Sequence, residues 1–199
     1  MKGNNTISSE FEKDYFEGYY RGAVGSFTKD DLEMARRWFT AWIKMSEYNP
    51  DANTGAVVMG NYSGDSKGSI FYVSNAGLLS IRPHLGVDLK GRTNIPTGEW
   101  THIATTLEGS NLKVYVNGEE DGSGTSAGYA GGNAKTFTIG KASWYDGSFF
   151  TGIIDEAGLF NKALSKDEVK SVMNAGLLGK AAVFSSGKLI FTWATIKAK

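Results

Sequence analysis

The chain has 199 residues, 21 of them basic and 21 acidic, so its formal net charge is zero and nothing in that balance favours nucleic acid or an anionic membrane as a partner. It contains no cysteine, which excludes disulfides and thiolate metal sites. No stretch of about 18 apolar residues is present, so no membrane span is expected. The first residues are polar and lack the apolar core of a signal peptide, so none is expected in this chain.

The composition and the spacing of apolar runs both favour β structure. With 26 glycines and 13% aromatic residues, the chain is suited to many turns and to aromatic packing. Residues 1–17 are interpreted as a loose lead-in, 18–27 as a short edge strand, and 28–38 as one or two helical turns. Short runs rich in β-branched and aromatic residues follow, bounded by Gly, Asn, Asp or Ser. They predict strands at 37–46, 56–63, 68–74, 77–83, 98–109, 111–118, 135–141, 149–164 and about 188–197.

The clearest hairpin joins 98–109 to 111–118. Apolar Leu112, Val114 and Val116 occupy every second position of its second arm, which is the period of a half-buried strand.

A turn and a loop are expected next. Asn117 and Gly118 form the dipeptide that favours a type I′ hairpin turn. The glycine- and serine-rich stretch 119–133 is interpreted as a surface loop, so the acidic residues at its start are expected to be solvated.

One firm helix is predicted at 165–176. Ser165 and Glu168 have the spacing of a capping box, in which each side chain bonds the other's backbone N–H. Gly176 stands at the expected C-terminal stop.

Strands at intervals of about eight to twelve residues, with one strong helix, are typical of an antiparallel sandwich. We therefore predict an all-β fold, a two-sheet β-sandwich or jelly roll, with one short helix on the C-terminal side. No repeat or linker divides the sequence, so residues 1–199 are expected to form a single domain.

Two segments carry a resemblance to a known family. "GEWTHIATTLEGSNLKVYVNGEE" resembles a segment of laminin-G-like domains in the concanavalin A-like lectin/glucanase superfamily. "FTIGK" and "FFTGIIDEAGLFNKALSKDEV" are similar to a second segment of that family, shared with pentraxins. The match is specific from Gly98 to Met173, looser from Trp38 to Pro83, and poor before Trp38. The N-terminal strand of the family is therefore expected to be missing, rearranged or supplied by the C-terminal tail.

Asp155 and Glu156 interrupt the predicted strand 149–164, one face of which (Ile153–Leu159) is expected in the core. A carboxylate there is costly unless it is hydrogen-bonded or bound to a cation. The resemblance implies that Asp155 contributes to a structural Ca²⁺ site, and oxygen ligands suit that ion. The alternative is that Asp155 accepts hydrogen bonds from the backbone or from a basic side chain. Glu156 is expected on the opposite face, paired with a basic neighbour.

The loop 141–150 is the candidate ligand site. The comparable pentraxin loop carries acidic calcium ligands, whereas here Asp146 is the single acid. Trp144 and Tyr145 remain at the loop tip, where aromatic faces can stack on a sugar ring. The alternative is that they cover the core or contact a protein. The other tryptophans are expected in the core or on a sheet face; they are Trp38, Trp42, Trp100 and Trp193.

Catalytic signals are weak. Retaining glycosidases hold two carboxylates about 5 Å apart, and the strand motif that supplies such a pair in this superfamily does not occur in the sequence. His84 and His102 lack partners at the spacing of a catalytic set. His102 is expected to form structural hydrogen bonds within its strand.

The leading hypothesis is a non-enzymatic binding or adhesion module, extracellular or on the cell surface, that recognises carbohydrate or a protein partner. A structural subunit that exchanges its terminal strands between protomers, and so forms a homo-oligomer, is the second hypothesis. A glycoside hydrolase is the third and the least favoured. The tail "KLIFTWATIK" is apolar on both faces and is expected to complete a sheet, either of its own chain, with the first 27 residues as a weak partner, or of a neighbouring chain.

Overall fold

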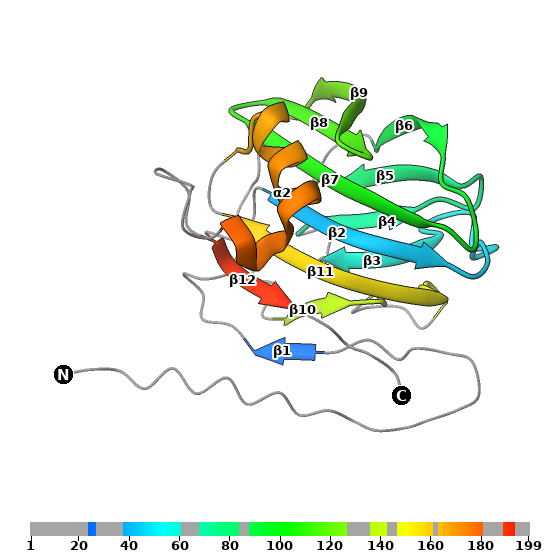
Figure 1. Ribbon diagram of the computed structural model, residues 1–199. Coiled ribbons are helices and arrows are strands. Elements are labelled where there is room, and N and C mark those ends of the chain that lie inside the picture. The colour runs from blue at the N-terminus through cyan, green and yellow to red at the C-terminus, as the bar shows by residue number, and fades with distance from the viewer. Residues whose placement is uncertain are drawn as a thin grey trace.

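Figure 1 shows the computed structural model of the chain. The structure describes residues 24–26, 38–60, 68–83, 88–126, 136–142, 147–160, 163–180 and 189–193. Within these residues two six-stranded antiparallel sheets pack face to face, which confirms the predicted sandwich. Sheet A runs in the order β1 (Val24–Ser26), β10 (Thr136–Ile139), β3 (Ala56–Gly60), β4 (Ile70–Val73), β5 (Leu78–Arg82) and β6 (Leu89–Asn94). Sheet B runs in the order β12 (Leu189–Trp193), β11 (Gly152–Phe160), β2 (Trp38–Met45), β7 (Trp100–Glu108), β8 (Asn111–Val116) and β9 (Glu119–Thr125).

The core lies between the two sheets and is built from alternate residues of the strands. The ring of Phe39 in β2 stacks on that of Phe71 in β4, with centroids 5.9 Å apart, so the two sheets meet through aromatic packing. Leu112, Val114 and Val116 of β8 are all buried in this core, as their period-2 spacing predicts. The hairpin β7–β8 is confirmed.

Helix α2 (Lys166–Lys180) lies on the outer face of sheet B, over one end of β2, β7 and β11 (Figure 1). Its capping box is formed: the Ser165 backbone N–H donates to Glu168 at 2.7 Å, and the Glu168 N–H donates to the Ser165 hydroxyl at 3.3 Å. Gly176 has φ 71°, a left-handed conformation that suits glycine. It kinks the helix where a stop was predicted, and helical structure then resumes as far as Lys180.

Two strands at one side of the sandwich were not predicted. The start of the stretch 119–133 is not a loop, because residues 119–125 form β9 and pair with β8. Strand β6 was missed altogether. The predicted solvated acid Asp121 is buried and accepts hydrogen bonds from the backbone N–H groups of Arg92 and Thr93 in β6. The predicted turn at Asn117 and Gly118 is confirmed in its backbone, since both have positive φ (50° and 78°).

The terminal strands join different sheets. β1 pairs with β10 at the edge of sheet A, as the predicted edge strand at 18–27 required. β12 pairs with β11 at the edge of sheet B, so the tail completes a sheet of its own chain. β12 does not pair with β1, because the two strands belong to separate sheets. Residues 1–17 and 28–37 lie outside the described part of the chain.

Candidate ligand-binding face

The candidate site lies on the outer face of sheet A. Along β4, Phe71 and Val73 point into the core, and Ile70 and Tyr72 therefore point outward. Ile70 and Tyr72 pack with Val57 and Ala142 in a separate buried cluster. Ala142 is two positions before Trp144, the first predicted ligand-binding residue, so the N-terminal side of that loop starts on this face of the sheet.

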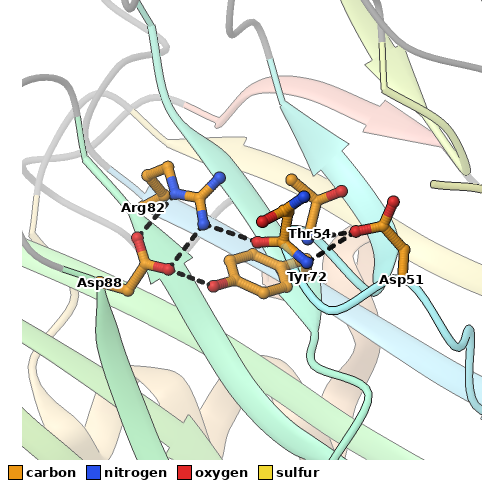
Figure 2. Close-up of polar contacts among 6 residues, drawn as sticks. Asp51, Thr54, Tyr72, Arg82 and Asp88 are labelled. Carbon is orange, nitrogen blue, oxygen red and sulfur yellow. Dashed lines mark hydrogen bonds and ion pairs between the residues drawn. The ribbon is translucent and has the colours of Figure 1, made fainter. Parts of the chain in front are cut away.

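A polar cluster continues this face, as Figure 2 shows. The Arg82 guanidinium binds the Asp88 carboxylate through two hydrogen bonds, Nε to Oδ1 at 2.7 Å and Nη2 to Oδ2 at 2.8 Å. The Tyr72 hydroxyl donates to Asp88 Oδ2 at 2.5 Å. Arg82 Cζ also lies 5.6 Å from the centroid of the Tyr72 ring, within range of a cation–π contact. The three side chains therefore hold one another in a fixed arrangement.

The protonation states of this cluster follow from its burial and its hydrogen bonds. Burial, and then the hydrogen bond to Asp88, raise the pKa of Tyr72 far above its ordinary value, so the phenol stays neutral. Burial alone would raise the pKa of Asp88, but the hydrogen bonds from Arg82 and Tyr72 outweigh it and lower that pKa. Asp88 is therefore an ionised carboxylate that accepts hydrogen bonds, and it is poorly suited to act as a general acid.

The turn before β3 folds over this cluster. Asp51 Oδ1 accepts hydrogen bonds from the backbone N–H groups of Asn53 and Thr54, at 2.7 and 3.0 Å, which fixes the turn as an Asx-type structure. Arg82 Nη2 then donates to the Asn53 carbonyl at 2.7 Å (Figure 2). Arg82 therefore joins the turn to the Asp88 carboxylate.

The same turn anchors the C-terminal side of the candidate loop 141–150. The Asn49 side-chain amide donates to the carbonyls of Gly147 and Phe149, both at 3.0 Å. The Thr54 hydroxyl contacts the Ser148 hydroxyl, and both side chains are buried. The chain therefore rejoins the described structure beside the 49–54 turn. Trp144, Tyr145 and Asp146 themselves lie outside the described residues.

Asp155 and Glu156 lie at an irregularity in β11. Asp155 pairs with Trp42 and Gly158 with Thr40, so β11 carries one extra residue here, a β-bulge. Glu156 has φ 46° at this bulge. Ile154, Ala157 and Leu159 pack in or against the core, as predicted for one face of the strand.

The carboxylates occupy the outer side of sheet B. Asp155 Oδ1 accepts a hydrogen bond from the Glu156 backbone N–H at 2.8 Å, in line with the hydrogen-bonded alternative. The prediction for Glu156 is wrong for the described residues: its carboxylate lies against helix α2 and accepts a hydrogen bond from the backbone N–H of Leu177, and no basic side chain in this part of the chain pairs with it. Burial, and then the neighbouring Asp155, raise the pKa of Glu156.

The described residues do not by themselves assemble a calcium site at Asp155. No group of three or more His, Cys, Asp or Glu side chains that could hold a metal ion occurs among them. Asp155 offers one carboxylate, and its neighbour Glu156 is directed to the helix, whereas Ca²⁺ takes six to eight oxygen ligands. Calcium binding stays a prediction. In the described part of the chain, no helix is long and apolar enough to cross a membrane.

His102 has the structural role predicted for it. Its Nε2 lies 2.8 Å from the Thr40 hydroxyl oxygen, and its backbone N–H donates to the side chain of Asn117 at 3.0 Å. The Trp42 ring packs edge-on against it, with centroids 5.4 Å apart. Burial lowers the pKa of His102 to about 4, so the imidazole is neutral at physiological pH.

Sequence reasoning missed the cluster of Tyr72, Arg82 and Asp88. Arg82 ends a strand that was predicted, but Asp88 lies in a stretch to which no element was assigned. The usable signal is a basic and an acidic residue on either side of a short connection, since a hairpin brings such residues together.

Comparison with known proteins agrees with this architecture. Residues 37–170 match the family model of the concanavalin A-like lectin/glucanases superfamily, and the chain belongs to that family. No curated protein sequence matches it significantly.

Three solved structures share the fold. A protein of Bacteroides ovatus, described as a candidate carbohydrate-binding protein, is 21% identical with a TM-score of 0.61; the match covers 80% of this chain and 45% of that one. The CBM40 of the Ruminococcus gnavus IT-sialidase, bound to α2,3-sialyllactose, is 14% identical with a TM-score of 0.59, covering 76% and 92%. Domain 4 of AbnA, a GH43 extracellular arabinanase of Geobacillus stearothermophilus, in complex with arabinotriose, is 23% identical with a TM-score of 0.55, covering 84% and 86%. At these identities the likeness shows the fold alone.

Proposed function

We propose that this chain is a non-catalytic carbohydrate-binding module that acts outside the cell or at its surface. Its ligand would lie at the outer face of sheet A, against Trp144, Tyr145 and Asp146. The observation that carries this proposal is the double hydrogen bond from Asn49 to the carbonyls of Gly147 and Phe149, which fixes one side of that loop beside an ordered polar cluster. Two of the solved structures with the same fold hold a bound sugar, which supports the ligand class.

The chemistry of this face suits a sugar. A pyranose or furanose ring has an apolar face that can pack on the aromatic rings of Trp144 and Tyr145. The hydroxyl groups of the sugar need hydrogen-bond donors and acceptors. Asp146 belongs to the same loop as the two aromatic residues, and the polar turn at 49–54 contacts the C-terminal side of that loop. Binding sites of this kind gain affinity when they are preorganised. Two hydrogen bonds preorganise this site. Asn49 holds the C-terminal side of the loop against the 49–54 turn, and Arg82 of β5 holds that turn against sheet A.

The proposal is tested on an array of plant, microbial and animal glycans, with the purified chain applied in calcium and in a chelator. We expect binding to at least one class of oligosaccharide, confirmed by titration in solution. A folded protein that binds no glycan on the array in either buffer would contradict the proposal. Capture of a protein ligand without any glycan binding would point to the protein-recognition alternative.

A further inference from the structure

Helix α2 leaves one end of the outer face of sheet B uncovered, as Figure 1 shows at the ends of β2, β7 and β11 away from the helix. Register defines which residues lie there. Ile153 pairs with Lys44, and Lys44 pairs with Trp100, so these three residues form one row across neighbouring strands. Cross-strand partners point to the same side of a sheet. Lys44 is on the outer side, since its neighbours Ile43 and Met45 are in the core.

This row is the most exposed apolar feature of the described residues. Trp100 is 44% exposed and Ile153 is 48% exposed, and they are the two large hydrophobic side chains found exposed there. Strands lie about 4.8 Å apart, so the Cα atoms of Trp100 and Ile153 are separated by about 10 Å. In the next row, half-buried Trp42 packs on His102. Single exposed apolar residues are ordinary on protein surfaces, but an aligned set marks a contact surface.

The occupant is indicated by the residue at the centre of the row. Lys44, a charged side chain, stands between Ile153 and Trp100. Lysine is depleted from the cores of protein–protein interfaces, because an ammonium group without a partner is costly to bury. A sugar chain has an apolar ring face for Trp100 and Ile153 and hydroxyl groups that can accept from Lys44, and it leaves the ammonium group hydrated at one side.

We propose that Trp100, Lys44 and Ile153 form a second carbohydrate-binding surface, a flat platform for an extended, neutral polysaccharide chain. This platform lies on the outer face of sheet B, whereas Ala142 and Tyr72 lie on the outer face of sheet A, and the platform does not depend on the site proposed there. The strand register holds the platform rigid, so binding needs no rearrangement of a loop. Trp100 supplies the stacking surface, and Lys44 donates to the ring hydroxyls.

The test is affinity electrophoresis in native gels that contain hydroxyethylcellulose, xylan, arabinan or galactomannan, with insoluble cellulose pull-down in parallel. We expect at least one polysaccharide to retard the wild-type chain. Trp100→Ala should weaken that interaction by about tenfold or more, because it removes the aromatic face on which the sugar ring packs. Trp100→Phe should keep most of it, and Lys44→Ala should weaken it less than Trp100→Ala. Because Trp100 is 44% exposed, we expect both Trp100 variants to fold, with melting temperatures close to that of the wild-type chain, and thermal unfolding of all three variants is the control.

Comparison with the Trp144→Ala/Tyr145→Ala variant separates the two sites. Retardation lost only in Trp100→Ala supports the platform even if the loop site fails. Retardation lost only in the loop variant overturns the platform and leaves the proposed function intact. The platform is also overturned if none of these polysaccharides binds the wild-type chain, or if Trp100→Ala dissociates an oligomer detected by analytical ultracentrifugation, which would assign this face to a protein contact.

Discussion

Asp121 and Thr93 join the edge strands of the two sheets. Asp121 belongs to β9 of sheet B, and its Oδ1 accepts from the Thr93 backbone N–H at 3.0 Å and from the Thr93 hydroxyl at 2.5 Å, in β6 of sheet A. Asp121 Oδ2 also accepts from the Arg92 backbone N–H at 3.0 Å. The Asp121 carboxylate therefore accepts hydrogen bonds from backbone N–H groups of β6, the edge strand of sheet A, which have no further strand to pair with. These hydrogen bonds link the two sheets at this side of the sandwich.

Removing this carboxylate should destabilise the fold. Asp121→Ala removes the acceptor of the Arg92 and Thr93 backbone N–H groups, in hydrogen bonds that are partly buried, so the free energy of unfolding should fall by about 1–3 kcal/mol. The matched control is Glu120→Gln, because Glu120 is the preceding residue and forms an exposed ion pair with Lys113. That change should cost less than about 1 kcal/mol. Urea denaturation of the two variants is the measurement, and equal transition midpoints would contradict the role of Asp121.

His102 should make stability depend on pH. Its pKa is 6.5 in the unfolded chain and about 4 in the folded one, so between these values the unfolded state binds the extra proton. The stability that the neutral imidazole contributes is complete above pH 6.5 and is lost as pH falls towards 4, up to about 3 kcal/mol. The free energy of unfolding should therefore fall more steeply between pH 7 and 4.5 in the wild-type chain than in His102→Gln. Parallel curves for the two proteins would show that His102 is not responsible.

The local features of the fold could be predicted from sequence, because short-range chemistry decides them. Ser165 and Glu168 are three residues apart and cap a helix wherever the chain places it. Asn117 and Gly118 accept positive φ with little strain, so the hairpin turn follows. The alternation in β8 likewise needed only neighbouring positions.

Features that depend on distant strands could not be predicted. β6 and β9 are polar edge strands without an alternating apolar pattern, and they exist because β5 and β8 provide partners. The bulge at Asp155 is set by pairing with β2, so the sequence could not show that Glu156 turns towards helix α2. The cluster of Tyr72 and Asp88 required the β5–β6 hairpin, which was not anticipated.

Calcium removal tests the family-based prediction for Asp155. If Asp155 helps to hold Ca²⁺, a chelator should lower the melting temperature, because an ion that binds only the native state stabilises it by mass action. Asp155→Ala should abolish the calcium-dependent part of that change. Identical melting curves with and without chelator would exclude a stabilising calcium ion at this residue.

The C-terminal strand should be needed for a soluble monomer. β12 covers the edge of β11, and deletion of residues 186–199 would leave the backbone groups of β11 unpaired. We expect the truncated chain to be insoluble or to change its oligomeric state, as followed by light scattering. A soluble, monomeric product with the wild-type melting temperature would show that β12 is dispensable.

The central claim is that this protein binds carbohydrate through the loop 141–150, and the most direct measurement is a calorimetric titration. The best oligosaccharide from the array is titrated into the wild-type chain and into the Trp144→Ala/Tyr145→Ala variant. The variant should keep its melting temperature and bind at least about tenfold more weakly, a loss of about 1.4 kcal/mol, because both aromatic rings that pack on the sugar are removed. A folded variant that binds this oligosaccharide with unchanged affinity would contradict the account. A variant destabilised by about 3–5 kcal/mol would also contradict it, since that loss would assign the two rings to the core.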